Sequence, residues 1–179
     1  MTEPPFEHIR FSVVETLRQG DCLLVAIDDT SYTAPIEAVY GATIGSHYRH
    51  CLEHFEALLN TVASGRVDYD ARLRDPVVEN DRATALVRTR ALIARFRDGL
   101  AKEELAAPVS IRCKVSYLGE VSPEVASTFA REAMYAVVHA IHHYALIGII
   151  CRLQGVPPPE GFGIAPSTAQ HRRLSSTRS

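Results

Sequence analysis

The histidines are the residues of this sequence whose type and spacing could do chemistry. Six of the eight fall into two short clusters: His47, His50, His54, His139, His142 and His143. Histidines four residues apart lie one turn apart on the same face of a helix, so the rings of His139 and His143 can reach a single ion. Neutral imidazole is the commonest metal ligand among protein side chains. The two clusters therefore predict a metal site where two helices meet.

Each cluster lies in a stretch whose apolar residues have helical spacing. The first belongs to a helix expected over residues 43–63, with Gly65 as its C-terminal stop. The second belongs to a helix expected over residues 127–153, which is apolar nearly all round and should therefore be buried. Two further helices are expected over residues 6–28 and 77–104.

A strand and a hairpin are expected between the third and fourth of these helices. Residues 108–117 alternate apolar and polar side chains, the period of a half-buried strand, and Gly119 marks a turn into a return strand. The first helix should be bent or interrupted at Gly20. The fold class predicted is all-α, an up-down-type four-helix bundle with a short β-hairpin before the last helix. The bundle would occupy residues 1–165, and residues 166–179 would form a flexible tail.

Composition narrows the class of protein. The chain has 179 residues, 46% hydrophobic and 22% charged, which favours one globular domain. Its net charge of -2 argues against nucleic acid or an anionic membrane as partner. The four cysteines are dispersed and no signal peptide is recognisable, so we expect free thiols and a cytoplasmic location. Three histidines inside the last helix make a membrane span costly.

Two segments resemble the DinB-like superfamily of metalloenzymes. They are residues 43–56 (TIGSHYRHCLEHFE) and residues 139–147 (HAIHHYALI), and the likeness extends over most of the chain. That superfamily takes one ligand from its second helix and an H-x-x-x-H pair from its fourth. The resemblance therefore implies a histidine triad site of His50, His139 and His143 for a divalent ion, Zn, Ni, Fe or Mn.

The resemblance also implies a function. Members include thiol-dependent transferases, so we expect a metal-dependent transferase or hydrolase whose partners are a small-molecule substrate and a low-molecular-weight thiol. The metal would lower the pKa of a bound water or thiol. Two alternatives stay open: a non-catalytic, metal-stabilised module for dimerisation or binding, and a metal-free bundle whose histidines bond to one another. The apolar last helix is compatible with a homodimer.

Five more residues are candidates for supporting roles. His47 is an alternative first ligand, and His54 is either an extra ligand or a hydrogen-bond partner of one. His142 points away from the H-x-x-x-H pair and could bond across the bundle. Tyr69 and Arg72, in the charged connection after the second helix, could bind an anionic substrate, the arginine by bidentate pairing with a carboxylate. The alternative without a functional role is that this connection is a solvated loop whose charged residues form ion pairs with one another.

Overall fold

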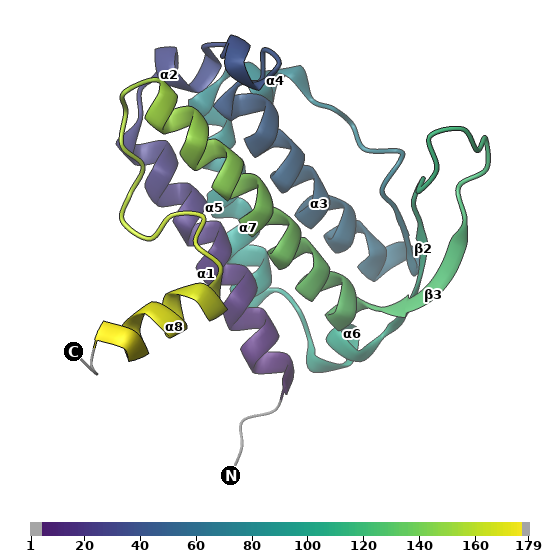
Figure 1. The fold of residues 1–179 in the computed structure, drawn as a ribbon. Helices are drawn as coiled ribbons and strands as arrows, with labels where there is room; N and C mark the ends of the chain where they lie inside the picture. Colours follow the sequence, from purple (N-terminus) through teal and green to yellow (C-terminus); the bar gives the residue numbers. More distant parts are fainter. Residues whose placement is uncertain (1–4, 177–179) are drawn as a thin grey trace.

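The computed structural model describes residues 5–176, which are mostly helical (Figure 1). The long helices are α1 (Pro5–Ala26), α3 (Ile44–Ser64), α5 (Arg82–Asp98) and α7 (Phe129–Leu153). The short helices are α2 (Asp29–Thr33), the 3-10 helix η1 (Glu37–Val39), α4 (Pro76–Asn80), α6 (Lys102–Ala106) and α8 (Pro166–Ser176). The strands are β1 (Arg66–Asp68), β2 (Pro108–Arg112) and β3 (Glu124–Thr128). The expectation of a helix-rich fold is confirmed.

Helix α7 packs against two other long helices. It contacts α3 on one side and α1 on the other, and α5 in turn contacts α1 and α3 (Figure 1). Small residues of α7, Ala133, Ala136 and Ala140, are buried and let its neighbours approach closely. By length and composition alone α7 could cross a membrane. Its packing against α1 and α3 helps to bury 39% of its most apolar 18-residue stretch.

The ends of α3 follow from local capping. The Thr43 side chain accepts the Ser46 N–H at 2.9 Å, and the Ser46 hydroxyl oxygen accepts the Thr43 N–H at 3.1 Å. This reciprocal pair satisfies two donors that the first turn leaves free. Gly65 ends the helix in the left-handed region, at a φ of 68°. These caps define where α3 begins and ends.

The one helix expected over residues 6–28 is present as α1, which continues through Gly20 without an interruption. The glycine is needed there for space, because a Cβ at this position would collide with the hydroxyl groups of Tyr48 and Tyr144. Gly20 therefore marks a close approach of three helices.

The single helix expected over residues 77–104 was wrong, because this segment forms α4, α5 and α6. Asp81 is extended, with a φ of −128°, and its side chain accepts the N–H groups of Ala83 and Thr84 at 2.9 and 3.2 Å. An aspartate in this role starts a new helix. Gly99 then caps α5 at its C-terminal end.

A three-stranded sheet has the order β1-β2-β3. Strands β2 and β3 are antiparallel, with Ile111 opposite Val125, whereas β1 is parallel to β2, with Val67 opposite Ile111. The strand expected over residues 108–117 ends at Arg112, and β1 was not predicted. Figure 1 shows the sheet beside the C-terminal end of α3 and the start of α7.

The segment expected to be a flexible tail contains a helix. Residues 166–176 form α8, of which no residue is buried, and residues 177–179 lie outside the described part of the chain. Just before α8, Phe162 is buried and stacks on Tyr144 with ring centroids 4.8 Å apart. The domain boundary at residue 165 remains a prediction.

Candidate metal centre

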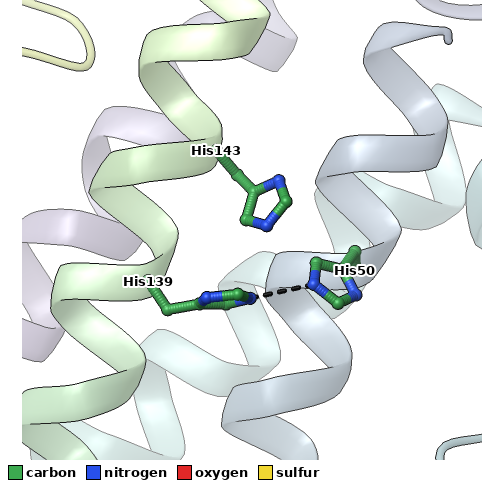
Figure 2. Close-up of side chains that lie close together, drawn as sticks. All are labelled: His50, His139 and His143. Atoms are coloured by element: carbon green, nitrogen blue, oxygen red, sulfur yellow. Dashed lines mark hydrogen bonds between the residues drawn. The ribbon is translucent and has the colours of Figure 1, made fainter. Parts of the chain in front are cut away.

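The three histidines assigned as ligands lie together between α3 and α7. His50 comes from α3, and His139 and His143 come from adjacent turns of α7. One ring nitrogen of each lies within 4.8 Å of the others. The Nε2 atoms of His139 and His50 are 2.8 Å apart, and the ring of His143 points toward the space beside them (Figure 2).

The three rings are uncharged at neutral pH. Burial lowers the pKa of His50 to about 2, of His143 to about 3 and of His139 to about 4. Nearby positive charge adds to this effect: Arg72 lowers the pKa of both His50 and His139. A neutral imidazole keeps a lone pair for a metal ion, so the donor set fits a divalent transition metal.

His47 lies outside this group of three and contacts one member of it. Its Nδ1 is 2.9 Å from Nδ1 of His143, and burial lowers its own pKa. If Nε2 of His143 holds an ion, its Nδ1 carries the proton and donates to His47. Metal-bound histidines ordinarily have such an acceptor for the outer N–H. The structure thus places His47 beside a candidate ligand.

His54 is buried against the same group. Its Nδ1–H donates to the backbone carbonyl of His50 at 2.9 Å, which leaves Nε2 as its unprotonated nitrogen. Its ring centroid is 4.2 Å from that of His139, and burial lowers its pKa to about 3. His142, by contrast, is exposed and meets His143 edge-on, with centroids 5.4 Å apart. His142 therefore points away from the group, as its spacing predicts.

Two tyrosines pack against the histidines of this group. Tyr69 is buried, stacks on His54 with centroids 5.1 Å apart, and donates its hydroxyl to Glu132 at 3.0 Å. The hydrogen bond to the buried carboxylate of Glu132 holds the Tyr69 ring in place, and this ring in turn positions the ring of His54. Tyr135 stacks on His139 with centroids 5.6 Å apart. Sequence reasoning missed Tyr135, although its position four residues before His139 places it on the same helix face.

Arg72 reaches the centre from the loop after β1. Its Nε donates to the Tyr69 carbonyl at 2.8 Å, and its Nη1 donates to Nδ1 of His50. A guanidinium only donates, so Nδ1 of His50 is unprotonated and its Nε2 carries the hydrogen. That hydrogen then bonds to Nε2 of His139. Arg72 therefore sets the tautomers of two candidate ligands.

Comparison with known proteins finds a similarity to FK506-binding protein 5 of Rhizopus delemar, with 36% identity over 105 residues. The similar stretch covers 59% of this chain and 27% of that protein, so the chain spans about a quarter of the relative's length. No family model matches the chain, and no solved structure matches it.

This similarity overturns the assignment to the DinB-like superfamily, because the relative belongs to a different family. The metal-dependent thiol transferase or hydrolase inferred from that assignment was therefore wrong, as was its alternative, the metal-stabilised dimerisation module. The H-x-x-x-H motif, on which the assignment to that superfamily depended, is not specific to one family. An H-x-x-x-H spacing follows from the period of any helix, so it identifies a shared face and no particular ancestry.

Proposed function

We propose that the protein binds a divalent transition-metal ion through His50, His139 and His143. The observation that supports this proposal is the meeting of three neutral imidazoles whose nitrogen atoms lie within 4.8 Å of one another. Three protein ligands leave a position of a four-coordinate ion open to water or a small molecule. Zn, Ni, Fe and Mn are the candidate ions, and a bound ion would supply Lewis acidity at that position.

The surroundings of the rings support the same proposal. His143 has an acceptor for its outer nitrogen in His47. Tyr135 and His54 pack against His139 and restrict its ring. Ligands whose orientations are set before binding lose less entropy when the ion arrives.

Elemental analysis tests the site directly. The chain, purified without chelator and then incubated with ZnCl₂ or NiCl₂ and desalted, should carry about one ion per molecule, as expected of a single three-ligand centre. The double variant His139→Ala/His143→Ala should carry none. His142→Ala is the matched control, since it removes an exposed ring of the same cluster, and it should keep the ion. An unloaded parent protein, or equal loss in the control, would contradict the site.

Binding of FK506 is a second candidate function, supported by the similarity to FK506-binding protein 5. Titration calorimetry of the metal-free chain with FK506 tests it. We expect a heat of binding that saturates as FK506 is added. If that ligand uses a surface apart from the histidines, His139→Ala/His143→Ala should bind it equally well. Absence of heat at high protein concentration would remove this candidate.

We also propose a finer architecture and setting. The four long helices would form an up-down bundle, and β2 with β3 the hairpin before α7, as the contacts of α7 with α1 and α3 favour. Exposed apolar residues of α7, Met134, Val138 and Ile149, would pair two copies into a homodimer. The four free cysteines accord with a cytoplasmic location. Sedimentation equilibrium before and after Val138→Glu tests the dimer.

A further inference from the structure

A cleft of about 370 Å³ lies beside the metal centre, between α3 and the loop after β1. Its charged lining residues are Arg66, Arg72, Arg88, Glu53, Glu56 and Asp68. Two of the arginines have carboxylate partners: Arg88 bonds to Glu56 at 2.7 Å, and Arg66 bonds to Glu124 at 2.9 Å. Arg72 makes no salt bridge to any carboxylate in the part of the chain that the structure describes.

The neighbouring acidic groups make their direct contacts with other partners. Glu53 accepts the backbone N–H of Asp75 at 2.9 Å, and Asp68 pairs with Arg112 at 3.6 Å. The histidines beside Arg72 carry no negative charge in either protonation state, so they do not balance its charge. Glu53 compensates the charge of the half-buried Arg72 in part, without a direct ion pair, and a divalent ion nearby would add positive charge beside the guanidinium. Arg72 is therefore the arginine of this cleft that lacks a direct carboxylate partner among the described residues.

We propose that Arg72 binds the carboxylate group of a small ligand in this cleft. A carboxylate offers two oxygens that match the edge of a guanidinium, whereas the acidic lining opposes a more highly charged phosphate. Arg72 has five N–H donors, and the contacts of Nε with Tyr69 and of Nη1 with His50 and His54 leave the donors of Nη2 for the ligand. Ala57, Ala71 and Leu73 line the same cleft and leave room for a short apolar body.

The carboxylate and the metal ion should also strengthen each other's binding; this second part rests on the proposed function. Nδ1 of His50 now accepts from Arg72, and its Nε2 carries the hydrogen. An ion at Nε2 requires the hydrogen to move to Nδ1, where it opposes the donors of Arg72. Arg72 must then turn from His50 and becomes free for the carboxylate. By thermodynamic linkage, the carboxylate raises the affinity for the ion by the same factor as the ion raises the affinity for the carboxylate.

The experiment uses cobalt(II) as the metal probe and propionate as the carboxylate probe. Propionate is titrated into the cobalt-loaded chain while the visible absorption of cobalt is recorded, and into the ¹⁵N-labelled metal-free chain while the Arg72 Nε–H resonance is followed. The variants are Arg72→Ala, Arg72→Lys and, as control, Arg90→Ala, which alters an arginine outside the cleft that pairs with Asp21. Near-ultraviolet circular dichroism verifies the fold of each.

Saturable propionate binding is expected in both forms, tighter with cobalt. Arg72→Ala should weaken it about tenfold or more, since a charge-assisted bidentate pair is lost. Arg72→Lys should recover part of the loss, and Arg90→Ala should bind normally. Binding unchanged in Arg72→Ala, or absent from a cobalt-loaded chain, would overturn the inference. If cobalt does not bind, the proposed function fails, and the Arg72 resonance alone decides: a shift with propionate supports the carboxylate site, and no shift overturns it.

Discussion

The rings of His47 and His143 face each other through the same kind of nitrogen, with Nδ1 atoms 2.9 Å apart. One of these atoms must donate and the other accept, so the two neutral rings hold complementary tautomers. The tautomer in which His143 donates leaves its Nε2 free to bind an ion. A residue of α3 outside the group of three thus controls whether a residue of α7 can act as a ligand.

Replacement of His47 by alanine should therefore weaken metal binding without removing the ligand set. We expect a loss of about 10- to 100-fold in affinity, typical for an outer partner of a metal-bound histidine, with about one ion still bound at saturation. Competition with a chromogenic chelator measures the affinity, and His142→Ala serves as the control. A loss as large as that of His143→Ala would assign His47 to the ligands.

The metal-free protein should lose stability in mild acid. The folded rings of His50, His139 and His143 have pKa values of about 2 to 4, against 6.5 for an ordinary histidine. Below pH 6.5 the unfolded chain takes up protons that the folded rings do not, so the free energy of unfolding falls as the pH drops toward 4. The slope is at most about 1.4 kcal/mol per pH unit for each ring, less where water reaches it.

Urea unfolding at pH 7 and pH 5 measures this dependence. The variant His50→Gln/His139→Gln should show a smaller difference between the two midpoints, because two of the titrating rings are gone. An equal difference in parent and variant would show that other groups cause the acid sensitivity.

Two glycines in helices should respond oppositely to alanine. Gly20→Ala should destabilise by about 1–3 kcal/mol, because its Cβ collides with the hydroxyls of Tyr48 and Tyr144. Gly148→Ala in α7 is the matched control, since a Cβ there meets nothing within 4 Å. It should stabilise by roughly 0.5–1 kcal/mol through reduced backbone entropy of the unfolded chain. Urea unfolding distinguishes the two, and effects of the same sign would refute the packing at Gly20.

Tyr69→Phe should destabilise by about 1–3 kcal/mol, the cost of removing a donor from a buried carboxylate. Glu132 is 1% exposed, and after the change it keeps only the bonds from Ser127 at 2.8 Å and Arg131 at 2.7 Å. Tyr117→Phe removes a fully exposed hydroxyl and should have no effect. Thermal unfolding followed by circular dichroism compares them, and equal midpoints would argue against the Tyr69 bond.

The elements that could be predicted from the sequence are those with local signals. Helix α3 begins after Thr43 and ends at Gly65, both of which are capping residues that act on their own neighbours. Helix α7 was expected over residues 127–153 and spans Phe129–Leu153, because its apolar run is continuous. The sequence also predicted that the two histidine clusters meet, since each cluster lies on a long helix.

What escaped prediction depends on contacts between distant residues. Asp81 would be acceptable on an exposed helix face, and nothing nearby shows that it caps a new helix instead. The pairing of His47 with His143 depends on the rotation of α3 against α7, which spacing within either helix does not determine. Strand β1 has three residues, too few for a visible alternation, and its partner lies in β2.

The parallel pairing of β1 with β2 bears on the order in which the molecule folds. Residues 69–107 separate the two strands and include α4, α5 and α6. The entropy of closing so long a loop is recovered only after those helices have packed, so the sheet should form late. The loop that carries Arg72 starts directly after β1, and α7 follows directly after β3. During synthesis His50 therefore emerges long before His139 and His143, and the metal centre is completed only when α7 has packed against α3, after the residues that line the cleft are in place.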